Sequence, residues 1–253
     1  MLSEEEIGRL AKLRRVRPWQ EERRYLQALV LYSLSEEPIV LKGGTYLWFF
    51  HGLNRFSEDL DFTATKEVDR SMLEPASNTL RLFGVVNDAG VVKDDRYVLS
   101  FRISARGPLF TSEKDLCHIY VEVSRRDRPG PAPVPVKLDE PYYGIPLIFL
   151  RGMDLRELVS EKVRAVMTRN TARDLYDLWY VTVRLGVKPD LAGINEKLSF
   201  YDKRFDLKEF RDRVGAVQRF WEGELRPLVF GVLPEFGEVV RELEGVLRGV
   251  VQS

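Results

Sequence analysis

The sequence predicts an α+β fold, in which a small mixed sheet of four or five strands with flanking helices is followed by a helical C-terminal part. Short alternating segments typical of strands occur in the first half of the chain. Apolar residues at helical spacing dominate from about residue 150 onward. Between the halves, the proline-rich stretch 128–136 predicts a surface loop and an internal boundary. We therefore expect two domains, residues 1–149 and residues 150–253.

The expected elements alternate in the N-terminal part. Leucines at helical spacing predict helices within the first 35 residues, and short apolar or alternating runs next to glycine or polar residues predict strands. The expected strands are 38–42, 59–63, 97–104 and 116–124, and the other expected N-terminal helices are 45–52 and 67–83. In the C-terminal part, helices are expected at 154–169, 171–185, 190–200, 206–222 and 235–250.

Composition excludes several classes of protein. The 253 residues include 39 basic and 39 acidic side chains, so the chain is not a generally polybasic nucleic-acid coat. One cysteine and two histidines exclude a disulfide framework and a zinc site built from several of these ligands. No apolar run approaches the length of a membrane helix, and the acidic N-terminus lacks a signal-peptide core. We therefore expect a cytoplasmic protein.

Two aspartates and two glycines carry the clearest indication of chemistry. Asp59 and Asp61 are two apart on an expected strand, so both side chains face the same way. The pKa of one carboxyl group should rise unless cations lie between them, and Mg²⁺ prefers such carboxylates together with phosphate oxygens. Gly43 and Gly44 open an expected helix, whose free N–H groups suit a phosphate. Taken alone, the two patterns are more often a solvated strand face and a plain turn.

The order of these features resembles a known family. A glycine turn and helix precede a D-x-[DE] strand in the DNA polymerase β-like nucleotidyltransferases. The form K-G-G-T…R-x-S-x-D-L-D-F resembles more narrowly the AbiEii/AbiGii-type toxin nucleotidyltransferases of abortive-infection and toxin–antitoxin systems. The resemblance implies a nucleotidyltransferase-type sheet in which Gly43, Gly44 and Thr45 contact phosphates. Arg55 and Ser57 are further expected nucleotide-binding residues. Gly44 replaces a serine that many relatives have, so Thr45 would have to supply that hydroxyl.

A third carboxylate is expected from a neighbouring strand. Glu122 faces away from the apolar side of strand 116–124, where it is either solvated or part of the site. In the site, it would bind a metal ion or accept the proton of the attacking hydroxyl. Arg125, Arg126 and Arg128 follow directly. They form either a solvated loop or a grip on a polyanionic acceptor.

The C-terminal part offers a lysine and two aspartates. Lys162 lies near the middle of an apolar helix stripe, whereas Glu161 lies off it. An inward lysine needs an anionic partner, which is either a phosphate or an acid of the next helix. In that helix, an ion pair between Arg173 and Asp177 with a cap from Asp174 is the structural alternative. The pattern E-K-x-x-A…R-x-x-x-R-D-L-Y-D-L again resembles the AbiEii-type family. The resemblance implies that Lys162 and one of Asp174 or Asp177 belong to the active site.

The resemblance, which covers about residues 38–185, implies transfer of a nucleoside monophosphate from an NTP to a hydroxyl acceptor. Asp59, Asp61 and Glu122 would hold two Mg²⁺ ions, and Lys162 would neutralise charge on the phosphates. Metal, nucleotide and lysine are expected to meet in a cleft between the two parts. The acceptor would be the 3′ end of tRNA or a protein hydroxyl, and a toxin role implies a cognate antitoxin. The alternatives are a non-catalytic module that binds RNA or a partner protein, and a metal-dependent nuclease.

Overall fold

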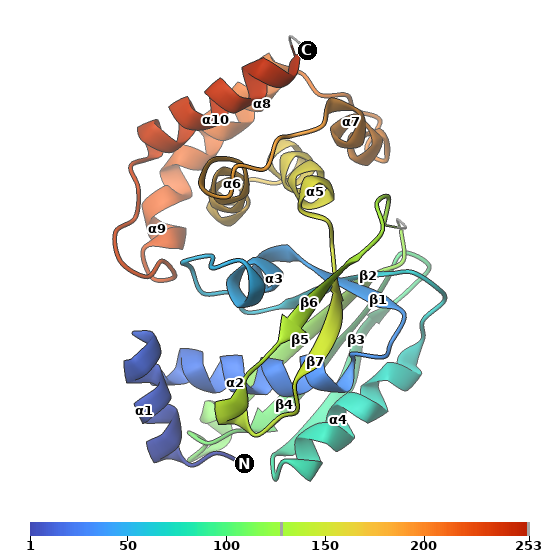
Figure 1. Ribbon diagram of the computed structural model, residues 1–253, viewed down its shortest axis with the longest axis vertical. Coiled ribbons are helices and arrows are strands. Elements are labelled where there is room, and N and C mark those ends of the chain that lie inside the picture. The colour runs from blue at the N-terminus through green and yellow to red at the C-terminus, as the bar shows by residue number, and fades with distance from the viewer. Residues whose placement is uncertain (127–128, 252–253) are drawn as a thin grey trace. The chain divides into compact units, whose positions relative to one another are not determined.

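The computed structural model describes residues 1–126 and 129–251, except for the side chains of residues 250 and 251. The chain forms two compact units (Figure 1). The sheet unit comprises Met1–Gly52 and Phe56–Met153, and the helical unit comprises Leu53–Arg55 and Asp154–Ser253. The predicted boundary between residues 149 and 150 falls inside strand β7 (Ile148–Gly152).

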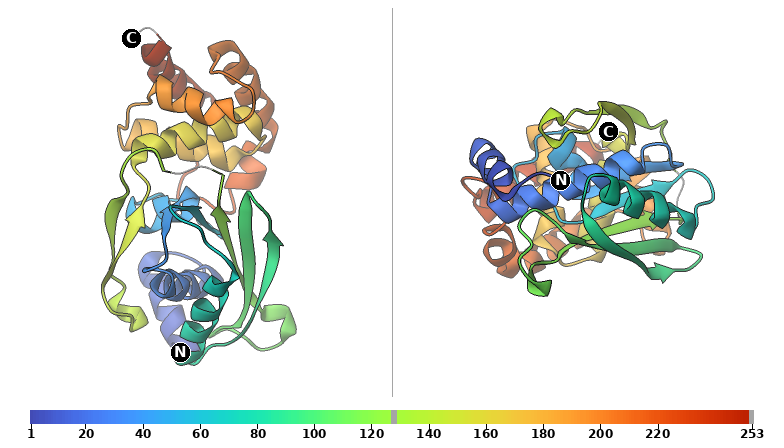
Figure 2. Two further views of the ribbon diagram at one scale, coloured as in Figure 1. Left: turned by 90° about the vertical axis from the view of Figure 1, so that its right-hand side faces the viewer. Right: turned by 90° about the horizontal axis from the view of Figure 1, so that it is seen from below.

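The sheet unit contains a mixed sheet, which has seven strands in the described part of the chain. Their order is β3-β4-β5-β2-β1-β7-β6. The pairs β1/β7 and β2/β5 are parallel, and the other neighbours are antiparallel. In the left view of Figure 2, β3 and β4 form a long hairpin. Besides β7, the strands are β1 (Ile39–Lys42), β2 (Leu60–Ala64), β3 (Val86–Asp94), β4 (Val98–Arg106), β5 (Cys117–Ser124) and β6 (Val134–Leu138).

The predicted α+β class is confirmed, but the sheet is larger than predicted. The loop prediction for 128–136 is wrong at its end, because β6 begins at Val134 and pairs with β7. Pro135 is tolerated there because β6 is an edge strand, whose outer side needs no hydrogen bonds. The opposite edge, β3, was missed because its side chains are mostly exposed and do not alternate. Arg128 lies outside the described residues.

Helices cover one face of the sheet and leave part of the other face open. Helix α2 packs on β5, and α4 packs on β3. Accordingly Ile119, Val121 and Val123 of β5 are completely buried, whereas the intervening Tyr120 and Glu122 are exposed. The helices of this unit are α1 (Glu4–Arg14), α2 (Pro18–Ser33), α3 (Gly43–Phe50) and α4 (Leu73–Leu82), with 3₁₀ turns η1 (Arg70–Met72), η2 (Glu113–Asp115) and η3 (Pro141–Tyr143).

The helical unit confirms the helices predicted after residue 150. Helix α6 runs directly into a π-helical turn, η4 (Tyr180–Arg184). No helix in the described residues is long and apolar enough to cross a bilayer. The other elements are α5 (Leu155–Thr168), α6 (Ala172–Trp179), α7 (Leu191–Ser199), α8 (Leu207–Val217), η5 (Gln218–Phe220), α9 (Trp221–Leu225) and α10 (Phe236–Val251).

A short segment, Leu53–Arg55, interrupts the sheet unit in sequence and belongs to the helical unit. The side-chain oxygen of Asn54 accepts a hydrogen bond of 2.6 Å from the hydroxyl of Tyr176 on α6. The carbonyl of Asn54 accepts one of 2.8 Å from the N–H of Phe230. Arg55 also forms a β-bridge with Val229. The helical unit is therefore assembled from two separate stretches of the chain.

Candidate active site

Three charged residues form a row across the middle strands of the sheet. Lys42 on β1 lies opposite Asp61 on β2, and Asp61 lies beside Glu122 on β5. Residues in register on neighbouring strands point to the same face and lie about 5 Å apart. The Glu122 side chain is exposed to solvent at this position. The parallel pairing of β2 and β5 places it beside Asp61, as the third-carboxylate prediction requires.

The turn between β1 and α3 brings the backbone close to Asp61. Gly43 has a positive φ of 76°, a conformation that favours glycine. A Cβ atom at Gly43 would lie 2.3 Å from Oδ2 of Asp61, which is shorter than any allowed contact. The group that approaches this glycine is thus the Asp61 carboxylate. Any phosphate bound at the start of α3 would lie next to that carboxylate.

Buried side chains fix the segment before β2. Thr45, predicted to contact phosphate, is completely buried, and its hydroxyl donates to the carbonyl of Asp59. The amide of Gln27 on α2 donates to the carbonyl of Ser57 at 3.2 Å and to the carbonyl of Glu58 at 2.8 Å. Ser57 is itself buried. These contacts position the backbone of Asp59, whose side chain is exposed.

Asp59, Asp61 and Glu122 suit a cation whose remaining ligands come from the substrate and water better than a cation bound by protein ligands alone. In the part of the chain that the structure describes, no group of three or more His, Cys, Asp or Glu residues is arranged to hold a metal ion. Mg²⁺ usually binds one or two carboxylates and takes its other oxygens from water and phosphate. Exposed Asp59 and half-buried Asp61 match that requirement, and Glu122 lies beside them.

Four charged residues of the helical unit form a second group, the buried charge cluster of Arg55, Lys162, Asp174 and Asp177. The guanidinium of Arg55 donates two hydrogen bonds of 2.6 Å to the two carboxylate oxygens of Asp177. The ammonium of Lys162 lies 2.7 Å from Asp177 and 3.0 Å from Asp174. The hydroxyl of Thr171 donates to the other oxygen of Asp174 at 2.7 Å. Two cations and two anions make the cluster neutral.

Opposite charges hold every member of the cluster ionised. Burial alone would raise the pKa of the Asp177 carboxyl group, but Arg55 and Lys162 outweigh it and lower that pKa. Burial would likewise lower the pKa of Lys162, but Asp177 and Asp174 raise it. The pKa of Asp174 falls despite its burial, mainly because of Lys162 and the Thr171 hydroxyl. An intact cluster therefore carries four charges throughout the neutral pH range.

The contacts of Arg55, Asp177 and Glu161 differ from those that the sequence indicated. Arg55 is 4 % exposed and forms an ion pair with Asp177. No sequence pattern indicated this pair, because 122 positions separate the two residues. The structural alternative, an ion pair between Arg173 and Asp177, is not found among the described residues, where Asp177 binds Arg55 and Lys162. Glu161, expected off the apolar stripe, is instead buried and lies 4.0 Å from the ammonium of Lys197.

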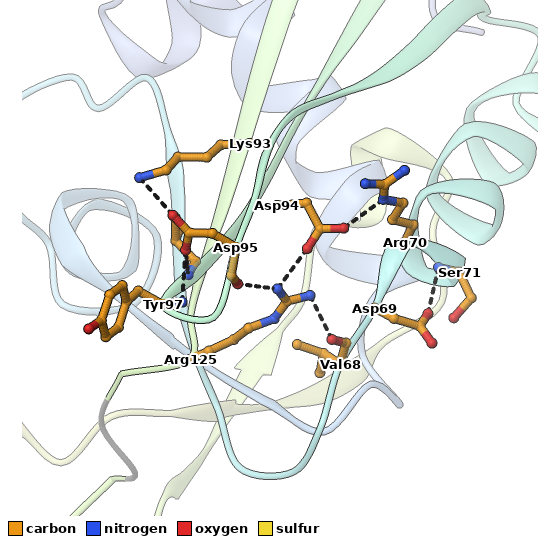
Figure 3. Close-up of polar contacts among 10 residues, drawn as sticks. Val68, Asp69, Arg70, Ser71, Lys93, Asp94, Asp95, Tyr97 and Arg125 are labelled. Carbon is orange, nitrogen blue, oxygen red and sulfur yellow. Dashed lines mark hydrogen bonds and ion pairs between the residues drawn. The ribbon is translucent and has the colours of Figure 1, made fainter.

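Arg125, one of the three arginines considered as a loop or a grip, forms its hydrogen bonds within the sheet unit. Its guanidinium donates to Asp94 at 2.7 Å, to the carbonyl of Asp95 at 2.6 Å and to the carbonyl of Val68 at 2.8 Å (Figure 3). Asp94 also accepts from Arg70, and these two arginines lower the pKa of its carboxyl group. Arg125 thus ties the β3–β4 turn to the end of β5. It is not available to grip an acceptor.

The predicted site residues form two groups. Sequence reasoning missed Lys42, whose place opposite Asp61 depends on strand register, and Gln27, which acts from a distant helix. The only signal for Lys42 was its position directly before the two glycines. The sheet unit carries Gly43, Gly44, Thr45, Ser57, Asp59, Asp61 and Glu122, and the helical unit carries Arg55, Lys162, Asp174 and Asp177.

Known proteins share both the sequence pattern and the fold. The family model of the nucleotidyl transferase AbiEii toxin, of type IV toxin–antitoxin systems, matches residues 24–242. MenT4, a nucleotidyltransferase toxin from Mycobacterium tuberculosis H37Rv, has a similar solved structure. It is 20% identical with a TM-score of 0.68, over 100% of this chain and 91% of that chain. JHP933 from Helicobacter pylori is 21% identical with a TM-score of 0.63, over 91% of each chain. A search of curated proteins finds no significant match.

Proposed function

The chain belongs to the AbiEii family of nucleotidyltransferase toxins and is a nucleotidyltransferase, and we propose that it transfers a nucleoside monophosphate from an NTP to a hydroxyl acceptor with the help of Mg²⁺. The observation that carries this proposal is the row of Lys42, Asp61 and Glu122 beside the Gly43 turn. It places two carboxylates on adjacent strands next to the start of a helix, where phosphate groups and Mg²⁺ are commonly bound.

Asp59 and Asp61 would hold the metal ions, and Glu122, which lies beside Asp61, takes the second of its two expected roles as proton acceptor. Two bound Mg²⁺ ions would polarise the phosphoryl oxygens and stabilise the attacking and leaving oxygens. The free N–H groups at the start of α3, at Gly43 and Gly44, donate to the triphosphate, and Lys42 adds a positive charge next to them. Thr45 and Ser57 act on the nucleotide indirectly, because both are buried: the Thr45 hydroxyl binds the carbonyl of Asp59, and the carbonyl of Ser57 accepts from Gln27 in the segment before Asp59.

The reaction is an in-line displacement at phosphorus. The acceptor hydroxyl oxygen attacks the α-phosphorus of the NTP while Glu122 accepts the hydroxyl proton. The bond between the α-phosphorus and the bridging oxygen breaks, and pyrophosphate leaves. Each turnover thus adds one nucleoside monophosphate to the acceptor and consumes one NTP.

In the buried charge cluster, Lys162 and Asp174 are the members that we assign to the reaction. Their side chains keep 10% and 14% exposure, whereas Asp177 has none. An ammonium that exchanges one carboxylate for a phosphate oxygen would neutralise charge that develops during transfer. Arg55 and Asp177 form a buried ion pair, and Asp177 holds Lys162 in place. We therefore assign Asp177 as a positioning residue and Asp174 as the second site residue.

The 3′ end of tRNA is the acceptor that we favour, with a protein hydroxyl as the second candidate. Because NTPs and tRNA are found together in the cytoplasm, we place the reaction there. The family also suggests a cognate antitoxin protein as a partner. A non-catalytic module would have no need for Asp61 and Glu122 side by side, and a nuclease would shorten RNA rather than lengthen it.

The test is incubation with each of the four α-labelled NTPs, Mg²⁺ and total tRNA, followed by separation of RNA and protein. We expect one or two of the NTPs to label an RNA product that is longer than its substrate. Asp61→Asn should abolish labelling and leave the melting temperature almost unchanged, because it removes both repulsion from Asp59 and a cross-strand attraction to Lys42 worth up to about 1 kcal/mol. Labelling at the wild-type rate by Asp61→Asn would refute the metal site.

A further inference from the structure

The open face of the sheet continues beyond the acids onto β4 and β5. Arg102 on β4 lies directly opposite Tyr120 on β5, so their Cβ atoms are about 5 Å apart on the same face. Glu122 lies two residues further along β5 on that face. Tyr120 is 41% exposed, and Arg102 is exposed. An aromatic ring and a guanidinium thus lie side by side next to the predicted site.

Neither side chain contributes a hydrogen bond or an ion pair to the described part of the fold. Among the described residues, Arg102 has no ion-pair or hydrogen-bond partner, and the Tyr120 hydroxyl has no hydrogen bond. Their neighbours on the same face do have partners. Arg106 binds Glu113 at 2.6 Å, and His118 Nδ1 lies 3.0 Å from the hydroxyl of Ser104. Because Arg102 and Tyr120 lie on two interior strands, their backbone positions are fixed, and their exposed side chains suit a ligand that stacks and carries negative charge.

The order of the strands puts this pair on the acceptor side. Gly43 follows β1, on one side of Asp61, whereas Glu122 and Tyr120 are on β5, on the other side. In an in-line displacement, the leaving pyrophosphate and the attacking hydroxyl lie on opposite sides of the phosphorus. If the triphosphate binds at the start of α3, the acceptor must approach from β5. Tyr120 is about 7 Å from Glu122 along that strand, close to the length of one nucleotide.

We propose that Tyr120 and Arg102 bind the terminal nucleotide of a single-stranded RNA acceptor, with its base stacked on the Tyr120 ring and its phosphate on Arg102. The ribose hydroxyl of that nucleotide then reaches Glu122 and Asp61. This inference rests on the proposed nucleotidyl transfer and identifies its acceptor subsite. A peptide acceptor is less suited to this face, because β4 and β5 are interior strands and offer no free edge for an added strand.

Binding can be measured without catalysis in the Asp61→Asn background, with total tRNA as the probe and filter retention as the readout. Adding Tyr120→Ala should weaken tRNA binding by about 5- to 150-fold, the usual loss on removing one base stack. Tyr120→Phe keeps the ring and should stay within about twofold. Arg102→Ala should reduce the slope of log affinity against log salt by about 0.7, the contribution of one phosphate contact to a single strand.

Tyr142→Ala is the matched control, since Tyr142 is 61% exposed on η3 of the same unit and should bind as the parent does. Melting temperatures of all variants confirm folding. In the active protein, Tyr120→Ala should raise the KM for tRNA and leave the KM for NTP within about twofold.

Unchanged tRNA binding by Tyr120→Ala, or no tRNA binding by the parent at low salt, would overturn the inference. Labelling of a protein at an equal rate by wild type and Tyr120→Ala would also overturn it, while the proposed transfer would stand. No labelling of RNA or protein by the wild type would instead refute the transfer, whatever the binding assay shows.

Discussion

Replacing Lys162 by methionine should strongly destabilise the protein. The substitution keeps the apolar stem but leaves two buried carboxylates, Asp174 and Asp177, with Arg55 as the one remaining cation of the cluster. Breaking a buried ion pair by removing one partner costs about 3–5 kcal/mol, because the other charge stays buried without compensation. For a chain of this size, roughly 2–4 °C is lost per kcal/mol, so the melting temperature should fall by about 6–20 °C.

A second substitution can restore the charge balance. In Lys162→Met combined with Asp174→Asn, the cluster again holds one cation and one anion, so most of the lost stability should return. Nucleotidyl transfer should not return, since both residues that we assign to the reaction are gone. Thermal melting followed by circular dichroism, together with the labelled-NTP assay, measures the two effects separately.

The control is Arg226→Met, which removes an ion pair with Glu222 whose two side chains are 72% and 71% exposed. Such a pair contributes about 0.3–0.5 kcal/mol, so this variant should melt within about 2 °C of wild type. The reasoning would be refuted if Lys162→Met melted as Arg226→Met does, or if the double variant were less stable than Lys162→Met.

Three further predictions follow from single features. Gly43→Ala should lower transfer far more than Gly144→Ala. Both glycines have a positive φ near 70–76°, so both variants should lose about 1 kcal/mol of stability in thermal melting. Only at Gly43 would the added methyl group displace the carboxylate of Asp61. The pKa of Asp174 in the folded state lies below its ordinary value of 3.8, so its contribution to the free energy of unfolding is present above about pH 4 and is lost as the pH falls further. In acid titrations followed by fluorescence, Asp174→Asn should therefore lose stability less steeply than wild type below pH 4. An equally steep loss would contradict the charged cluster. Burial raises the pKa of the Cys117 thiol to about 11, so iodoacetamide at pH 8 should alkylate it quickly only after unfolding, and rapid alkylation of the native protein would contradict this burial.

Short-range patterns predicted much of the fold. The alternation in 97–104 and 116–124 and the helical periodicity after residue 150 correspond to real strands and helices, because one face of each element is buried. Edge strands escaped prediction for other reasons. In β3 most side chains are exposed, so burial imposes little apolar alternation on the sequence. In β6 the residues do alternate, but the strand is short and the prolines in and before it indicated a loop.

The candidate site was predictable where its members are close in sequence. Gly43, Asp59 and Asp61 belong to one strand–helix–strand segment, so their pattern is visible without a structure. The pairing of Arg55 with Asp177 depends on how distant segments fold together, and no local periodicity records it. The same holds for Arg102 and Tyr120, which become neighbours only through the register of β4 and β5.

The inclusion of Leu53–Arg55 in the helical unit has a consequence for dissecting this protein. A truncation that begins at residue 154 would lack Arg55, so Asp174 and Asp177 would have Lys162 as their sole cation from the cluster, and Tyr176 and Phe230 would lose their bonds to Asn54. Such a piece should express poorly or aggregate. Chimeras between relatives should exchange residues 53–55 together with the C-terminal helices, because a simple crossover near residue 153 would separate an arginine from the aspartate that it neutralises.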